Sequence, residues 1–440
     1  MMSLPMKWTC SVSSADRNCS KVLASPFAFL RGSAAAGGAL VIGLHLARDG
    51  ARAAGGPDLS KAPAKPNAFV RIAADDTVSV VIKHLDMGQG NTTGLATIVA
   101  EELDADWAQM RAVFAPADAS LYNNLAFGPI QGTGGSTAIA NSWFQLRKAG
   151  AAARAMLVAA AAQEWKVPAA EITIEKGVLR HASGKEGRFG AFAAKAAVQP
   201  IPENPTLKDP SAFRLIGTRL PRLDSNAKTD GSAVYALDVR RPGQLTALVA
   251  RAPRFGATVK SVDDDAARAV PGVVQVVRIP SGVAVVARDT WSAMKGREAL
   301  TVTWDDTGAE RQSTESQQAA YKAMAAKPGL VASKRGDAAG GIKGAAKVLE
   351  AEFNFPYLAH APMEPLNATI ERAADGSYDI YAGSQFQTIE QAVAAGILGT
   401  TADKIRITTL WAGGSFQNTR PPFEGAVVRF PQSEWEQPAR

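Results

Sequence analysis

Side chains that bind metals are scarce in this chain of 440 residues. It has two cysteines, Cys10 and Cys19, and four histidines that are scattered singly. Two thiols near the amino terminus exclude a disulfide framework, and they exclude an iron–sulfur cluster or zinc site built from this chain's own thiolates. A metal bound by this protein must therefore be coordinated by a group other than its cysteine or histidine side chains.

Clustered positive charge is also missing. Lys and Arg number 48 against 41 Asp and Glu, a net charge of +7, and the excess is spread thinly along the chain. We therefore expect no nucleic-acid partner. Hydrophobic residues make up 46%, as in globular proteins. At roughly 150 residues per domain the length allows about two to four domains.

No apolar run near the amino terminus is long enough to span a bilayer, so we expect no stable transmembrane helix. Residues 33–46 form a shorter run, with Lys21 and Arg31 before it and a small-x-small cleavage candidate at 51–53. This layout is typical of an export signal, and a buried helix or an anchor is the alternative. Residues 25–31 resemble a twin-arginine signal without its arginine pair. A periplasmic location is expected if the signal works, and a cytoplasmic one stays open.

The usual nucleotide fingerprints are absent, since the chain has neither G-x-G-x-x-G nor a Walker lysine. Two other glycine turns precede predicted helices, at Met87–Gly90 and at Gly132–Thr137. Backbone N–H groups at such turns can face an anion. A plain strand–helix turn and a flexible loop are the alternatives.

Apolar periodicity predicts a mixture of helices and strands, an α+β chain with several domains. Strands are expected within 69–83 and 171–198 and at 245–250, 273–279, 283–287, 300–304, 347–355, 367–372, 377–382 and 405–410, and helices at 95–103, 143–165, 261–269, 290–298 and 387–398. Three further segments stand out: the proline-bracketed His360–Pro365, and Gly383–Thr388 and Trp411–Phe416, each of which follows a predicted strand. Ends of strands are where sites in α/β folds usually gather.

Taken in order, these motifs resemble the large subunit of the molybdenum hydroxylases, within the xanthine dehydrogenase / aldehyde oxidase superfamily, and most closely the isoquinoline 1-oxidoreductase beta type. The resemblance covers about residues 67–416. Its residues are Met87–Gly90 with Thr93, Glu101–Leu103, Gly134–Ser136, Ala149–Leu157, Gly231–Asp238, Pro271–Val273, His360–Pro365 and Ser384–Gln385.

The resemblance implies molybdopterin-binding domains on both sides of an a/b hammerhead domain, the last domain being incomplete. The expected parts are an atypical amino terminus with linker (1–66), a first molybdopterin-binding segment (67–200), a linker (201–225), the hammerhead domain (226–310), a connection (311–346), a partial molybdopterin-binding domain (347–416) and an unrelated tail (417–440).

A molybdenum cofactor is also implied, in the molybdopterin cytosine dinucleotide form. The resemblance assigns its binding to Gly88, Gln89, Gly90, Thr93, Gly134, Gly135, Ser136, Gly413, Gly414 and Phe416, with no metal ligand from the protein. Gln385 matches the family's glutamine near the metal's oxo group. The implied reaction hydroxylates an N-heterocycle or oxidises an aldehyde with water as the oxygen source, and electrons leave through a small [2Fe–2S] subunit.

The match ends at Phe416, which is followed by Gln417, Asn418 and Thr419. The family's later Gly-Glu-Pro-type loop, whose glutamate is the catalytic base, does not occur here, and Glu364 lies in a different motif. We therefore expect a truncated chain, whose alternative role is that of an inactive or frameshifted remnant acting at most as a scaffold. A periplasmic solute-binding protein is a third possibility, but it requires a duplication that the sequence does not show.

Overall fold

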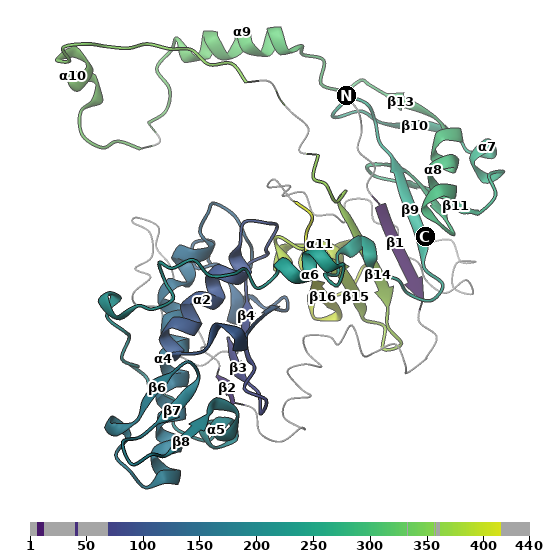
Figure 1. Ribbon diagram of the computed structural model, residues 1–440. Coiled ribbons are helices and arrows are strands. Elements are labelled where there is room, and N and C mark those ends of the chain that lie inside the picture. Colours follow the sequence, from purple (N-terminus) through teal and green to yellow (C-terminus); the bar gives the residue numbers. More distant parts are fainter. Residues whose placement is uncertain are drawn as a thin grey trace.

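The computed structural model describes residues 7–12, 40–42, 69–331, 333–355, 357 and 361–414 (Figure 1). Most of the predicted export signal, the twin-arginine-like segment, the cleavage candidate, His360, Phe416 and the tail lie outside these residues. Export and the role of Phe416 therefore stay predictions. Leu40–Ile42, inside the apolar run, forms the short strand β2.

The first unit is a four-stranded sheet with the order β2-β3-β4-β5. Strand β4 is buried along its whole length because its sequence, VSVVI, has few polar groups to solvate. It pairs antiparallel with β3 and parallel with β5. The elements of this unit are β2 (Leu40–Ile42), β3 (Val70–Ile72), β4 (Val78–Ile82), α2 (Asn91–Leu103), η2 (Trp107–Gln109), β5 (Met110–Phe114), α3 (Ala119–Tyr122) and α4 (Ala138–Trp165).

Helices α2 and α4 pack closely and run parallel. A Cβ on Gly94 would lie 3.0 Å from Ile139 Cδ1, near both amino termini, and one on Gly150 would lie 2.8 Å from Val99 O. Glycine and alanine keep this crossing tight, as the alanine-rich sequence of α4 predicts. The two amino termini therefore lie at the same end of the unit.

A small three-stranded sheet and an irregular connection complete this half of the chain. The predicted linker lies against α2: Glu101 Oε2 accepts the consecutive backbone N–H groups of residues 214–216, at 2.6–3.0 Å. The elements are η3 (Ala169–Glu171), β6 (Thr173–Glu175), β7 (Val178–Arg180), β8 (Glu186–Arg188), α5 (Phe189–Ala196), η4 (Pro210–Ala212) and α6 (Ser225–Asp230).

A seven-stranded sheet with the order β11-β12-β9-β1-β14-β15-β16 forms the second half. Strand β1 joins the predicted hammerhead strands to those of the last domain, antiparallel to β9 and parallel to β14. The elements are β1 (Lys7–Val12), η5 (Ala236–Asp238), β9 (Leu245–Ala250), β11 (Val273–Ile279), β12 (Gly282–Ala287), β14 (Asn367–Arg372), β15 (Tyr378–Ala382), α11 (Gln387–Ile397), η6 (Ala402–Lys404) and β16 (Ile405–Thr409).

Beside this sheet, β10 (Thr258–Asp263) and β13 (Thr301–Asp305) form a two-stranded ribbon, accompanied by α7 (Asp265–Arg268) and α8 (Thr290–Ala299). The prediction of a helix over 261–269 is wrong in its first half, because residues up to Asp263 pair with β13. The mixed α+β class and the multi-domain organisation are confirmed.

The strand predicted at 347–355 is not formed. Its alternating pattern is present, but no strand of the described residues lies beside it. This segment follows α9 (Thr314–Ala325) and α10 (Ala338–Lys343), and Figure 1 shows both helices standing away from the sheets.

Candidate functional site

Four loops meet between the two halves of the chain, and each follows the carboxyl end of a strand. Strands β4 and β5 are parallel, and so are β15 and β16. The loops are residues 83–90, 115–137, 383–386 and 410–414. Carboxyl ends of parallel strands lie at one edge of a sheet, so each pair presents two loops together.

One backbone and one side-chain hydrogen bond join the loops of the two halves. Thr133 N donates to Gln385 O at 2.9 Å, and Gln385 Nε2 donates to Thr133 O at 2.6 Å. A Cβ on Gly132 would lie 2.4 Å from the Phe386 ring, so only glycine fits there without moving the ring. The glycine turn at 132–136 and the Gln385 loop therefore form one surface.

The loop at 410–414 joins the same surface through Trp411. Its ring meets Phe114 edge to face, with centroids 5.0 Å apart, and the Lys228 Nζ lies 4.4 Å from its centroid. Gly413 N donates to Glu364 Oε2 at 2.8 Å. Glu364 is thus occupied with binding its neighbouring loops, a positioning role that agrees with not assigning it as the catalytic base.

Asp86 organises the first glycine loop. Its carboxylate accepts hydrogen bonds from Gly88 N, Thr92 N and Thr92 Oγ1 at 2.8–3.0 Å, so it caps the amino terminus of α2. Lys228 Nζ and Arg222 Nη2 lie 3.8 and 3.7 Å from it. Sequence reasoning missed Asp86 because the ordinary capping rule looks at the residue directly before a helix, which is Gly90 here, and Asp86 lies four residues earlier.

The amino terminus of α4 lacks such a cap. Thr137 makes no side-chain capping bond, and the first turn contains no acidic residue. Gly135 and Ser136 precede it, both exposed and both with positive φ, and their backbone N–H groups donate to no described residue. The positive pole of a helix of 28 residues therefore faces the loops without an anion of its own.

Most of the predicted cofactor residues lie in these loops, but they differ in exposure and in hydrogen-bond partners. Gly88, Gly135 and Ser136 are exposed, and a Cβ on Gly88 would meet open space. Gln89 folds back onto its own loop through Leu85 O and Met87 N. Thr93 Oγ1 accepts Leu223 N at 3.1 Å. Gly90, Gly134, Gly413 and Gly414 are partly buried, and Gln385 is buried.

Two buried titratable residues that sequence reasoning did not use lie beneath this surface. Lys83 Nζ donates to Gln145 Oε1 at 2.8 Å and to Asn123 O at 3.1 Å. Burial lowers the pKa of Lys83 to about 7. Burial, and then the charge of Lys83, lowers the pKa of His84 to about 3, so its imidazole is neutral. Through its hydrogen bonds to Asn123 O and Gln145 Oε1, Lys83 connects the 115–137 loop to α4.

We expect the free energy of unfolding to rise between about pH 7 and 10.5 because of Lys83. In that window unfolded Lys83 binds a proton that the folded protein releases, so raising the pH favours the folded state, by at most about 1.4 kcal/mol per unit. Denaturant unfolding at pH 7.5, 8.5 and 9.5, followed by a fluorescent label within the first unit so that only the transition of that unit is counted, measures it. Lys83→Met should flatten the rise, and the exposed Lys260→Met should not. An unchanged slope in Lys83→Met would show that Lys83 is not the cause.

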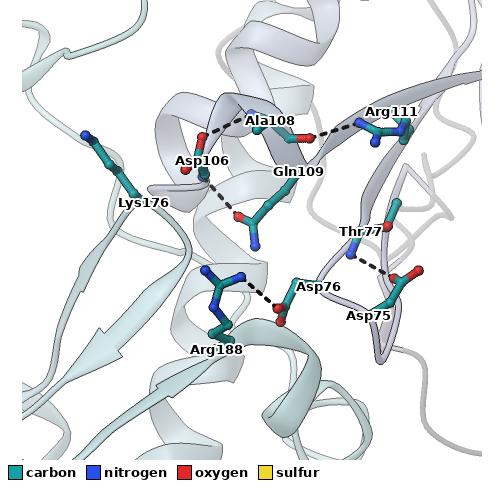
Figure 2. Close-up of a pocket in the computed structure, with 9 residues that line it drawn as sticks. All are labelled: Asp75, Asp76, Thr77, Asp106, Ala108, Gln109, Arg111, Lys176 and Arg188. Atoms are coloured by element: carbon teal, nitrogen blue, oxygen red, sulfur yellow. Dashed lines mark hydrogen bonds and ion pairs between the residues drawn. The ribbon is translucent and has the colours of Figure 1, made fainter.

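A charge-lined cavity of about 260 Å³ lies at the opposite end of β4 and β5. Figure 2 shows Arg188 pointing to Asp76, 3.1 Å away, and Asp106 bonded to Gln109 and Ala108. Three cations and three carboxylates line it, so its charges offset one another: Asp75, Asp76, Asp106, Arg111, Lys176 and Arg188. It lies away from the four loops, and we interpret it as structural.

Buried polar atoms without a partner gather around the four loops. Such atoms are costly, and a ligand or water commonly satisfies them. They include Gln131 Nε2, Asn141 Oδ1, Gln145 Nε2 and Gln387 Oε1. Together with the uncapped α4 and the glycine turns, these residues fit a polar organic cofactor with anionic groups.

Among the described residues, no cluster of three His, Cys, Asp or Glu side chains could hold a metal ion. No helix in the part of the chain that the structure describes is long and apolar enough to cross a bilayer.

Comparison with known proteins gives two matches to models described as molybdopterin cofactor-binding domain, at residues 32–238 and 322–428. The beta subunit of isoquinoline 1-oxidoreductase of Brevundimonas diminuta is 36% identical over 84% of this chain and 52% of its own length. The membrane-bound aldehyde dehydrogenase [pyrroloquinoline-quinone] of Gluconacetobacter polyoxogenes is 31% identical over 80% and 46%. A nicotinate dehydrogenase subunit of Pseudomonas putida is 30% identical over 79% and 29%.

The chain spans about half the length of the first two of these relatives and less of the third. Both matched models describe binding of the same cofactor, and they cover the residues that supply all four loops. The chain belongs to the family of molybdenum hydroxylase large subunits, and its matched domains bind the molybdopterin cofactor.

Proposed function

We propose that the four loops hold the molybdenum–molybdopterin cofactor in its cytosine dinucleotide form. The uncapped amino terminus of α4 carries this proposal, because a dinucleotide brings phosphates and helix amino termini favour them. The exposed backbone N–H groups of Gly135 and Ser136 hold the phosphate oxygens. Gly88 leaves room for a ring edge, since a Cβ there would point into open space.

When bound, the cofactor supplies a redox-active molybdenum centre beside the substrate carbon. This chain's residues position it. The Thr133–Gln385 hydrogen bonds keep the two halves of the site in register. The resemblance implies a contact between Gln385 and the metal's oxo group, and the amide nitrogen, which already donates to Thr133 O, has two N–H groups for such contacts.

We further propose that the whole enzyme hydroxylates N-heterocycles or oxidises aldehydes, with electrons leaving through a small [2Fe–2S] subunit. The names of the relatives support this substrate range, since two name an N-heterocycle and one an aldehyde. The absence of a cysteine-rich motif here is the reason for assigning the cluster to another subunit.

Metal and pterin analysis tests the cofactor proposal. We expect the chain, purified from cells that make the cytosine dinucleotide cofactor, to contain stoichiometric molybdenum and pterin and to release CMP on acid hydrolysis. The partner subunit of the Brevundimonas diminuta isoquinoline 1-oxidoreductase, added in a parallel preparation, tests the proposed [2Fe–2S] partner. The readout is its iron content and dye reduction with isoquinoline. Protein free of pterin in both preparations would contradict cofactor binding.

A non-catalytic scaffold is the second candidate. It is the alternative for these 440 residues taken alone, which contain no Gly-Glu-Pro-type loop. Pterin binding without turnover in the presence of the [2Fe–2S] subunit distinguishes it from the enzyme.

A further inference from the structure

His84 is a buried histidine that lies just beyond the carboxyl end of β4, and it is only 1% exposed. Burial and the charge of Lys83 lower the pKa of His84, and a hydrogen bond from its ring to the backbone of Gly132 opposes them without restoring the charge. A neutral imidazole has one ring nitrogen that donates a hydrogen bond and one that accepts. The groups around the ring therefore decide which nitrogen carries the proton.

Asn141 determines which ring nitrogen of His84 is the acceptor. Asn141 Nδ2 donates to Thr137 O at 2.7 Å, and because a carbonyl oxygen can only accept, the amide atom at this place is the nitrogen. The same nitrogen lies 3.1 Å from His84 Nε2 and has a second N–H for it. His84 Nε2 is therefore the acceptor and Nδ1 carries the proton, so the hydrogen bond to the Gly132 backbone comes from Nδ1.

Further hydrogen bonds connect Asn141 to the exposed glycine turn. Asn141 N also donates to Thr137 O, at 2.9 Å, so Asn141 binds the residue before α4 twice. Thr137 donates to Gly134 O through its backbone N at 3.2 Å and through Oγ1 at 2.8 Å. The two residues between Gly134 and Thr137 are those whose exposed N–H groups form the proposed phosphate contact. His84 is thus connected to that turn through Asn141 and Thr137.

The opposite tautomer of His84 would not permit these contacts. A proton on Nε2 would point at an N–H of Asn141, so two donors would face each other and one side chain would have to turn away. Turning the Asn141 amide would break its hydrogen bond to Thr137 O at the start of α4. Asn141 is 2% exposed, and a buried N–H without an acceptor is costly. The position of the first turn of α4 therefore depends on the tautomer of His84.

We propose that His84 is a positioning residue of the cofactor site, whose neutral Nδ1–H tautomer orients Asn141 and thereby holds the amino terminus of α4 where the phosphate binds. This inference rests on the proposed function for its consequence, phosphate binding. The tautomer and its effect on the start of α4 belong to the chain alone, and both are measurable without the cofactor.

NMR of the full chain labelled with ¹⁵N-histidine tests the tautomer in cofactor-free protein. The chain has four histidines, and the set of ring signals that disappears in His84→Gln belongs to His84. We expect this set to show a proton on Nδ1 and none on Nε2, unchanged from pH 5.5 to 8. A proton on Nε2 at any pH in this range would overturn the proposal.

Two variants separate the accepting nitrogen of His84 from the size of its ring. In His84→Gln the amide oxygen reaches the place of Nε2 and accepts from Asn141, whereas in His84→Asn only the place of Nδ1 is filled. The backbone amide of Asn141 should exchange at least tenfold faster in His84→Asn than in the wild type, and less than threefold faster in His84→Gln. Pterin per chain after gel filtration should fall at least tenfold in His84→Asn and less than threefold in His84→Gln.

His181→Asn is the matched control, the same change at the histidine that follows β7, and it should leave both quantities unchanged. Equal exchange or equal pterin content in the two His84 variants would overturn the proposal, because the side chain would then not act through its accepting nitrogen. Wild-type protein without pterin would contradict the proposed function instead. In that case the tautomer and the exchange of the Asn141 amide still decide whether His84 positions α4.

Discussion

Replacing Arg147 by methionine is expected to destabilise the first half of the protein by about 3–5 kcal/mol. Arg147 Nε donates to Glu102 Oε1 at 2.6 Å, and the Glu102 side chain is 0% exposed. Removing the guanidinium leaves a buried carboxylate whose remaining cation, Arg154 Nη2, lies 4.0 Å from Oε2. Loss of the nearer counter-charge costs more than the ion pair itself contributes. Arg147 also lies 5.4 Å from the Trp143 ring and 5.2 Å from the Phe213 ring, so packing is lost as well.

The measurement is hydrogen exchange of α2 and α4, because a chain of several domains does not unfold in two states. The control is the double variant Arg147→Met with Glu102→Gln. Glutamine keeps an oxygen for Lys208 N, which donates to Glu102 Oε2 at 3.0 Å, and removes the unpaired charge. It should recover most of the loss. If the double variant is as unstable as Arg147→Met, the lost stability comes from packing and not from the unpaired charge of Glu102.

Ser136→Asp is expected to weaken retention of the cofactor at least tenfold. Its carboxylate would lie at the uncapped amino terminus of α4, where the phosphate is proposed to bind, and two anions cannot share that pole. A tenfold change in affinity corresponds to about 1.4 kcal/mol. Repulsion between two negative charges at the same helix end is large enough to produce it. Pterin per chain after gel filtration measures the effect.

Ser136→Asn provides the matched control, since asparagine has the same shape without the charge and tolerates the left-handed backbone at φ 55°. It should retain the cofactor. Ser316→Asp, an equal charge on the distant α9, should also retain it. Loss of pterin from Ser136→Asn would mean that the serine side chain itself is needed, and unchanged binding by Ser136→Asp would place the phosphates elsewhere.

Ordinary local rules predicted much of the secondary structure. The strands at 245–250, 273–279 and 367–372 were predicted with the bounds that β9, β11 and β14 have. Their alternating or continuous apolar pattern leaves few other conformations that bury it. The helix at 261–269 was predicted wrongly because its first residues find a partner strand far away in sequence, which periodicity cannot detect.

The candidate site was only partly predictable. Glycine turns and strand ends pointed to Gly135, Ser136 and Gln385, but the sequence could not show that Gln385 bonds Thr133, 252 residues away. Lys83 was missed because a lysine beside a strand is normally solvated, and its burial depends on Gln145 and on the backbone of Asn123.

By itself, the sequence determined the mixed α+β class, the family and the order of its motifs, because these depend on residue types along one chain. Only the tertiary structure decided which strand ends face each other, which helix pole lacks an anion and which strand lacks a neighbour. Hydrogen bonds between distant segments and the burial of charge settle those features, and both arise from contacts that no local pattern encodes.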